Sequence, residues 1–126
     1  MKSVSSLIIA LLVALAATAD GLAEVTGRPT VAVTQWTDAM ELFMEYPAPV
    51  SGQPTAFIVH LTIIDGFQPV REGTLTLNFR GPDGSQQQVV SGELLREGIF
   101  KPEVTLTEAG AYTFEMSYRG PGVTGS

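Results

Sequence analysis

The chain has 126 residues, enough for one folded domain but too few for two domains of ordinary size. It has no cysteine and one histidine, His60, which excludes disulfides, thiolate metal sites, cysteine nucleophiles, lipid-modified cysteines and zinc sites built from several imidazoles. The formal net charge of -6 argues against a nucleic-acid surface, because phosphate binding depends on clustered lysine and arginine.

The first residues have the pattern of a secretory signal peptide. Lys2 precedes an apolar run over residues 7–17, and Ala17-Thr18-Ala19 places small residues where a signal peptidase cuts. We therefore expect a signal helix over residues 1–19, with Ala23 as the alternative cleavage position. The run of about eleven residues is too short for a spanning helix, which needs roughly 20. Export of a chain without cysteine fits the periplasm of a Gram-negative bacterium.

The rest of the sequence predicts an all-β fold. Residues 20–29 are expected to be a flexible linker, and residues 121–126 a loop at which the sequence is truncated. Between them, over residues 30–120, glycine and proline recur every eight to twelve residues, and the segments they bound alternate apolar and polar side chains. This spacing predicts an immunoglobulin-like antiparallel sandwich of about six to seven strands.

The first predicted strands follow the linker. Val31 and Val33 lead to Trp36, which we expect to fill the core. In the next strand, Met40, Leu42, Met44 and Tyr46 share one face, while Glu41, Phe43 and Glu45 share the other. A helix through Trp36, Met40 and Phe43 is the alternative, and Pro47 would keep it short. Residues 55–64 are apolar on both faces, with Phe57, Val59, Leu61 and Ile63 on one face, which predicts a central strand.

Three further segments complete the predicted sandwich. Residues 74–80 form the clearest amphipathic strand, and a turn over residues 81–84 returns the chain as a hairpin partner over residues 86–90. Residues 92–98 are expected to be a polar connection. The strand around Pro102 is expected at an edge, because proline has no donor for a ladder hydrogen bond. The last strand covers residues 112–118.

The most specific local feature is the segment from Glu108 to Phe114. In immunoglobulin-like sandwiches, a tyrosine near the start of the penultimate strand closes a corner through its hydroxyl, two residues before a buried cysteine position. Tyr112 has this spacing, and Phe114 would fill the core position of that cysteine. Alternatively, the segment is an ordinary turn that leads into a strand, as occurs in many other β domains.

The strand that follows such a corner normally pairs with one more strand. After Arg119, only a glycine- and proline-rich segment remains in the sequence. An edge strand without this partner exposes its backbone, which folded proteins usually prevent. We therefore expect either a fragment of a longer protein, which we favour, or a domain that borrows a strand from a partner.

Few residues suggest chemistry. His60 lies in the strand that is apolar on both faces, where a structural role is more common than a ligand or proton-transfer role. Met40, Met44 and Met116 carry thioethers, which can bind Cu(I), but core filling is the ordinary use of methionine. Glu41 and Glu45 form a solvated acidic stripe rather than an acid and base couple. The sequence therefore predicts no enzyme, and no catalytic, cofactor-binding or metal-binding residue.

Three segments carry a family resemblance. They are residues 36–47, residues 57–62 and the turn Arg80-Gly81-Pro82-Asp83-Gly84. Together they resemble the region after the signal peptide in efflux RND transporter periplasmic adaptor subunits, which are membrane fusion proteins of the HlyD and heavy-metal-efflux type. The resemblance spans about residues 30–122 and rests on strand and turn patterns.

Membership of that family would imply an accessory interaction domain with a role in transmembrane transport, of which heavy-metal efflux is one form. Its partners would be the remaining adaptor domains, an RND pump and an outer-membrane channel. It would bind no nucleic acid, and it would contact a membrane only through an uncleaved signal peptide. A second resemblance, to small exported YtkA-like domains, rests on a late Gly-x-Tyr strand such as Gly110-Ala111-Tyr112. It would imply a free-standing β module for protein or copper binding.

Overall fold

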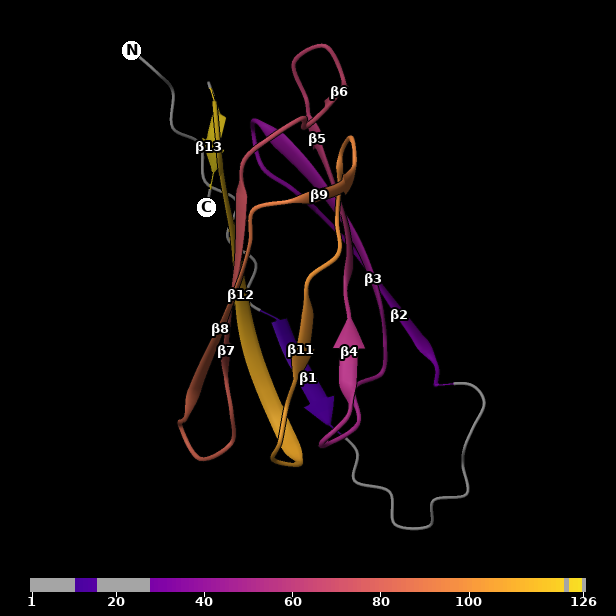
Figure 1. Cartoon of the computed structure of the whole chain (residues 1–126), viewed down its shortest axis with the longest axis vertical. Coiled ribbons are helices and arrows are strands. Elements are labelled where there is room, and N and C mark those ends of the chain that lie inside the picture. Colours follow the sequence, from indigo (N-terminus) through magenta and orange to yellow (C-terminus); the bar gives the residue numbers. More distant parts are fainter. Residues whose placement is uncertain (1–10, 16–27, 122, 126) are drawn as a thin grey trace.

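The structure is a computed structural model that describes residues 11–15, 28–121 and 123–125. Within these ranges every regular element is a β-strand, and the strands form two facing antiparallel layers (Figure 1). The predicted all-β sandwich is therefore confirmed. The predicted cleavage positions and most of the predicted linker lie outside the described residues.

The first layer is built around one long strand, β12 (Gly110–Gly120). On one side, β12 pairs with β7 (Thr74–Arg80), which pairs in turn with β8 (Gln86–Ser91). On the other side, β12 pairs with two short segments, β1 (Leu11–Leu15) and β13 (Val123–Gly125).

The second layer lies on the opposite side of the core. Its strands, in order, are β2 (Thr30–Trp36), β3 (Met40–Pro47), β5 (Ile58–Ile63), β10 (Ile99–Phe100) and β9 (Leu94–Arg96). A short strand, β6 (Gln68–Pro69), also pairs with β5. A separate small sheet pairs β4 (Pro54–Ala56) with β11 (Glu103–Thr105).

The strand order is that of an immunoglobulin-like sandwich. Strands β3, β5, β10 and β9 take the positions of strands A, B, E and D, and strands β8, β7 and β12 take those of strands C′, C and F. Strand β2 adds a further strand beside the A position. The position of strand G, next to β12, is occupied by β13 at one end and β1 at the other.

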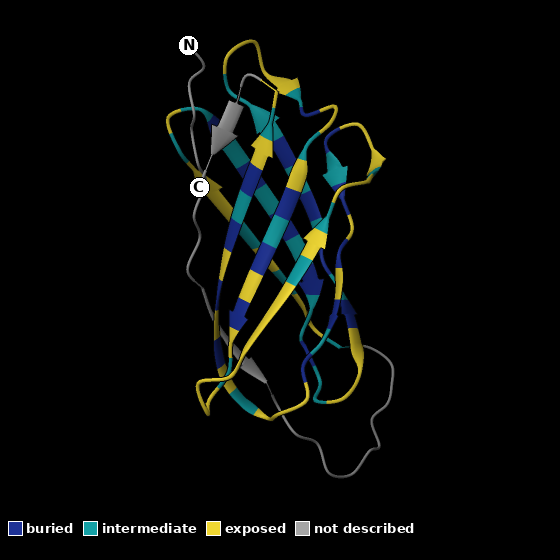
Figure 2. Cartoon of the chain, turned by 60° about the vertical axis from the view of Figure 1, so that its left-hand side comes forward, coloured by how far each residue is buried: buried dark blue, intermediate teal, exposed yellow. Residues whose placement is uncertain are grey.

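The core lies between the two layers and follows the alternation predicted for each strand (Figure 2). Met40, Leu42, Met44 and Tyr46 are buried on β3, and Leu75, Leu77 and Phe79 are buried on β7. The centre is aromatic. Phe114 stacks on Phe79, with ring centroids 5.1 Å apart, and meets Phe57 edge-on at 5.9 Å. Phe114 therefore fills the core position where related sandwiches with a disulfide carry a cysteine, as predicted.

The tyrosine corner is present at the start of β12. The Tyr112 hydroxyl donates a hydrogen bond to the Glu108 carbonyl oxygen at 2.8 Å and accepts one from the Glu108 backbone N–H at 3.2 Å. Tyr112 itself is only 5% exposed. The hydroxyl thus fixes the loop that leads from β11 into the first layer.

Replacing Tyr112 with phenylalanine is expected to remove both of these bonds while keeping the ring in the core. The free energy of unfolding should fall by about 1 kcal/mol, because Glu108 is exposed and water can replace the lost partner. Urea unfolding at neutral pH measures the change. A Tyr112→Phe variant as stable as the original chain would contradict a stabilising role for the corner.

A second tyrosine closes the other end of β12. The Tyr118 hydroxyl donates a hydrogen bond to the backbone carbonyl of Glu72, just before β7. Burial raises the pKa of this hydroxyl above the usual value of 10.0, and the nearby Glu72 carboxylate raises it further. The folded chain therefore holds Tyr118 neutral at pH values where the unfolded chain ionises it.

This pKa shift predicts a loss of stability in alkaline solution. The group titrates at a higher pH when folded, so its contribution is complete below about pH 10 and decreases as the pH rises above that value. A Tyr118→Phe variant should be less stable at pH 7, because it lacks the hydrogen bond to Glu72, but should lose less stability between pH 9 and pH 11. Urea unfolding across this pH range measures both effects. Parallel pH profiles for the two proteins would contradict the shift.

Several expectations from the sequence need correction. Trp36 is 59% exposed and does not fill the core. The register explains this, because Trp36 pairs with Glu41, which lies between the buried residues Met40 and Leu42 and so faces outward. The helix considered for this region does not form, since Met40–Pro47 is a strand. Within the predicted signal peptide, the described part, Leu11–Leu15, is a strand rather than a helix.

Three connecting segments also differ from the prediction. Residues 92–98 contain the short strand β9, because the free edge of β10 offers it a partner. The edge predicted around Pro102 is wrong for β10, which pairs with both β5 and β9, but holds for β11, which among the described residues pairs with β4 alone. Pro102 instead separates β10 from β11, and its carbonyl oxygen accepts a hydrogen bond from the Phe57 N–H at 2.8 Å. Residues 121–126, expected as a loop, contain the strand β13.

Candidate functional site

The outward surfaces of the two layers differ in chemistry. On the first layer, the outward positions of β7 and β12 are polar or small, as in Thr76, Asn78, Thr113 and Glu115, while β8 adds one exposed apolar residue, Val90, opposite Thr76. On the second layer, apolar and aromatic side chains occupy the centre of the outward surface. We call this surface the Phe43 face and define it by Glu41, Phe43, Glu45, Ile58, His60 and Ile99.

The Phe43 face is organised by the pairing register. Phe43 on β3 lies opposite His60 on β5, and Ile99 on β10 lies on the other side of His60. These three side chains therefore form one row across three strands. The rings of Phe43 and His60 are in contact, with centroids 5.5 Å apart and planes inclined at 59°. All three residues are half-buried although they face away from the core.

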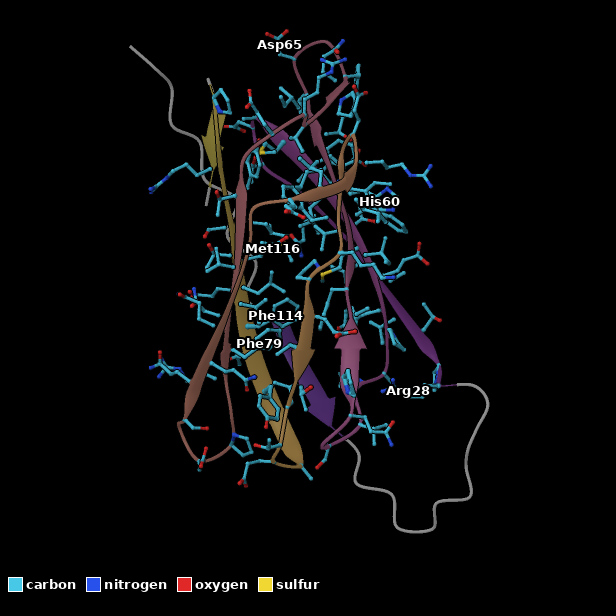
Figure 3. All side chains as sticks on the ribbon, viewed as in Figure 1. Arg28, His60, Asp65, Phe79, Phe114 and Met116 are labelled. Atoms are coloured by element: carbon cyan, nitrogen blue, oxygen red, sulfur yellow. The ribbon has the colours of Figure 1, made fainter. Side chains whose placement is uncertain are left out.

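His60 occupies the centre of this row. It lies on the side of the second layer that faces away from Phe79 and Phe114 (Figure 3). Among the described residues, no three histidine, aspartate or glutamate side chains form a group that could hold a metal ion. The strand of His60 is central, as predicted, since β5 pairs with both β3 and β10.

The two glutamates considered earlier border the same row. Glu41 and Glu45 lie on either side of Phe43 along β3, and both are half-buried. The register places Glu41 opposite Thr62 and Glu45 opposite Ile58. At its far end, the row meets Arg96 on β9, which pairs with Ile99. The Phe43 face therefore combines an apolar row with carboxylates along β3 and a cation on β9, which suits a protein surface that carries both apolar and charged residues.

The three methionines considered as copper ligands are core residues. Met40, Met44 and Met116 each have 0% exposed surface. Met40 and Met44 lie on the inner face of β3, and Met116 faces them from β12 in the other layer. An ion could reach these thioethers only if the sandwich opened, so the arrangement matches core filling.

Two exposed aromatic residues lie at one end of the sandwich. Phe67 is 72% exposed and has a positive φ of 50°, which is unusual for a residue with a side chain. Its turn is tied to the β2–β3 hairpin, where Trp36 lies, by a hydrogen bond of 2.9 Å from the Ile64 N–H to the Ala39 carbonyl oxygen. Strained backbone and exposed aromatic groups both occur often at binding sites.

Sequence reasoning found the components of the Phe43 face but not their arrangement. It placed Phe43 with Glu41 and Glu45 on one side of a strand, and His60 on one side of another. It did not bring Phe43, His60 and Ile99 together, because the pairing register between strands is set by packing and turns and not by any single segment. It also gave no sign of the strained turn at Phe67.

Comparison with protein-family models, with curated proteins and with solved structures finds no significant match to the chain. Among the described residues there is also no helix with the length and hydropathy needed to span a membrane.

Proposed function

We propose that the chain is a non-enzymatic periplasmic interaction domain of an RND efflux adaptor. In this proposal, the domain is exported by its signal segment and acts by binding protein surfaces rather than by catalysis. Its partners are the remaining adaptor domains, the RND pump or the outer-membrane channel.

The observation that carries the proposal is the difference between the two outward surfaces. A sandwich that only needed solubility would have polar side chains on both, as the surface of β7 and β12 has. The row of Phe43, His60 and Ile99 instead presents apolar and aromatic groups over three strands, which is typical of the centre of a protein interface. Immunoglobulin-like sandwiches are common interaction modules, and the three segments resembling adaptor subunits support the choice of partner.

The proposal favours protein contact over the alternative of a copper-binding module. The methionines that could bind Cu(I) are enclosed in the core. The surface available for a partner carries carboxylates at Glu41 and Glu45 beside aromatic and aliphatic groups. Together with Arg96, which pairs with Ile99, these groups suit an apolar and charged protein surface better than a soft metal ion.

The experiment that tests the proposal measures efflux in the native bacterium. A Phe43→Lys substitution places a charge in the centre of the Phe43 face and is expected to increase accumulation of a fluorescent efflux substrate to the level of a strain that lacks the gene. The matched control is Asn78→Lys, which adds the same charge to the opposite layer at an exposed position of β7. Both variants are first checked for an unchanged melting temperature and for normal export. Efflux that is unaffected by both variants, or by deletion of the gene, would contradict the proposal.

A further inference from the structure

One strand position of the sandwich is built from the two ends of the sequence. β13 pairs with Tyr118–Gly120 of β12, and β1 pairs with Gly110–Phe114 on the same edge. Both segments run antiparallel to β12, so they lie one after the other along its edge and point in the same direction (Figure 1). Among the described residues, no strand pairs with this edge between them, at residues 115–117.

The part of the edge paired with β1 borders the centre of the core. The β12 residues there alternate between buried Tyr112 and Phe114 and exposed Ala111 and Thr113. A strand paired at this position has every second residue on the core side of the layer. An apolar sequence fits such a position, and the segment that pairs there, Leu11–Leu15, is uncharged and aliphatic throughout.

Removal of the predicted signal peptide would take β1 away from this edge. Cleavage after either Ala19 or Ala23 separates Leu11–Leu15 from the sandwich. The backbone groups of Gly110–Phe114 that face β1 would then lose their partners, next to two buried aromatic residues. An edge of this kind readily accepts another strand.

We propose that the β12 edge over Gly110–Phe114 is a strand-acceptor site that, after the signal segment leaves, binds an extended, uncharged aliphatic strand of a partner protein antiparallel to β12. The chemistry of the bound strand follows from Leu11–Leu15, which occupies the same position. A second copy of the chain is a poorer occupant, because the 126 residues include 13 acidic and 7 basic residues, cleavage removes one of the basic ones, Lys2, and two copies therefore repel. This inference rests on the export step of the proposed function but not on the efflux partners, and it concerns a different surface from the Phe43 face.

The test uses the purified full chain and frees the edge without truncation. The variant carries prolines at two successive positions, Leu12→Pro and Val13→Pro. Because successive backbone N–H groups of a strand point to opposite sides, one of the two faces β12, and the prolines remove that hydrogen-bond donor in either case. The matched control places the same two prolines upstream, Ser5→Pro with Ser6→Pro. The probe is a synthetic peptide with the sequence Leu-Leu-Val-Ala-Leu between lysine pairs, and the control peptide is Leu-Pro-Pro-Ala-Leu between the same lysines.

Two measurements are made, the binding of labelled peptide by fluorescence anisotropy and the hydrogen exchange of the Gly110–Phe114 amides. In the Leu12→Pro/Val13→Pro variant, we expect faster exchange at Gly110–Phe114 and peptide binding at least about tenfold tighter than in the original chain or the upstream control, because β1 no longer competes. The peptide should restore slow exchange at these amides, and the control peptide should not. The amides of β7 report whether the variant is folded.

Three results would overturn the proposal. The first is exchange at Gly110–Phe114 that is unchanged by the prolines, together with no peptide binding. The second is an equal affinity for both peptides. The third is a Leu12→Pro/Val13→Pro variant that is dimeric and in which the Gly110–Phe114 amides still exchange slowly, because a second copy of the chain would then occupy the edge. If the proline variant does not fold, the test uses the original chain with excess peptide, which competes with β1 for the β12 edge. The expected result is faster hydrogen exchange at Leu11–Leu15 while the amides of Gly110–Phe114 stay protected. Unchanged exchange at Leu11–Leu15 would overturn the proposal.

Discussion

Replacing Phe114 with alanine is expected to lower the free energy of unfolding by about 3–5 kcal/mol, the usual cost of removing a fully buried aromatic ring. Phe114 is 1% exposed, and its ring lies 5.1 Å from that of Phe79 and 5.9 Å from that of Phe57. These two rings belong to different layers, so the loss of Phe114 would leave a cavity where the layers meet. A small domain has about 5–15 kcal/mol of total stability, so this single change brings it close to unfolding.

Urea unfolding followed by tryptophan fluorescence and circular dichroism measures this effect. The matched control is Thr113→Ala, at the preceding position of the same strand, where the side chain is exposed and the expected change is within about 0.5 kcal/mol. If Phe114→Ala and Thr113→Ala have equal stabilities, Phe114 does not join the two layers as described.

The second large effect is expected at Gly73, just before β7. Its φ of +140° is a conformation that residues with a side chain rarely adopt. A Cβ atom at this position would lie 2.6 Å from the Tyr118 ring and 2.7 Å from the Arg119 carbonyl oxygen. A Gly73→Ala variant therefore combines backbone strain with a clash against backbone, and the expected loss is about 3 kcal/mol.

Two other glycines give reference values. Gly52 also has a positive φ, +78°, but a Cβ there meets no atom within 4 Å, so Gly52→Ala reports the cost of a milder backbone conformation without a clash. A Cβ at Gly92 likewise meets no atom within 4 Å, and Gly92→Ala gives the baseline. Urea unfolding is expected to rank the three losses in the order Gly73, Gly52, Gly92. A Gly73→Ala variant no less stable than Gly52→Ala would show that the contact with Tyr118 is not tight.

Most of the fold could be predicted from local patterns. The alternation in β3 and β7 identified their buried faces, because each strand has one face in the core and a period of two makes this visible in the sequence. The tyrosine corner could be predicted because its partner, Glu108, lies only four residues from Tyr112. Both features depend on residues that are near one another in the chain.

The expectations that failed depend on contacts between distant segments. Trp36 has the size and hydrophobicity of a core residue, but its pairing with Glu41 turns it outward. The pairing of β1 with β12 joins residues about a hundred positions apart, and nothing in the apolar run of residues 7–17 indicates a strand partner. The row of Phe43, His60 and Ile99 likewise exists only because β3, β5 and β10 pair in one register.

The central claim is that the Phe43 face is the surface by which this domain binds a protein of an efflux assembly. The most direct measurement places a photoreactive benzoylphenylalanine at Phe43 in the full chain, irradiates the native bacterium and identifies the crosslinked protein by mass spectrometry. The same group at Asn78, an exposed position of β7 on the opposite layer, is the control. The expected result is a crosslink from Phe43, and not from Asn78, to an RND pump, an outer-membrane channel or another adaptor domain. No crosslink from Phe43, or the same products from both positions, would contradict the claim.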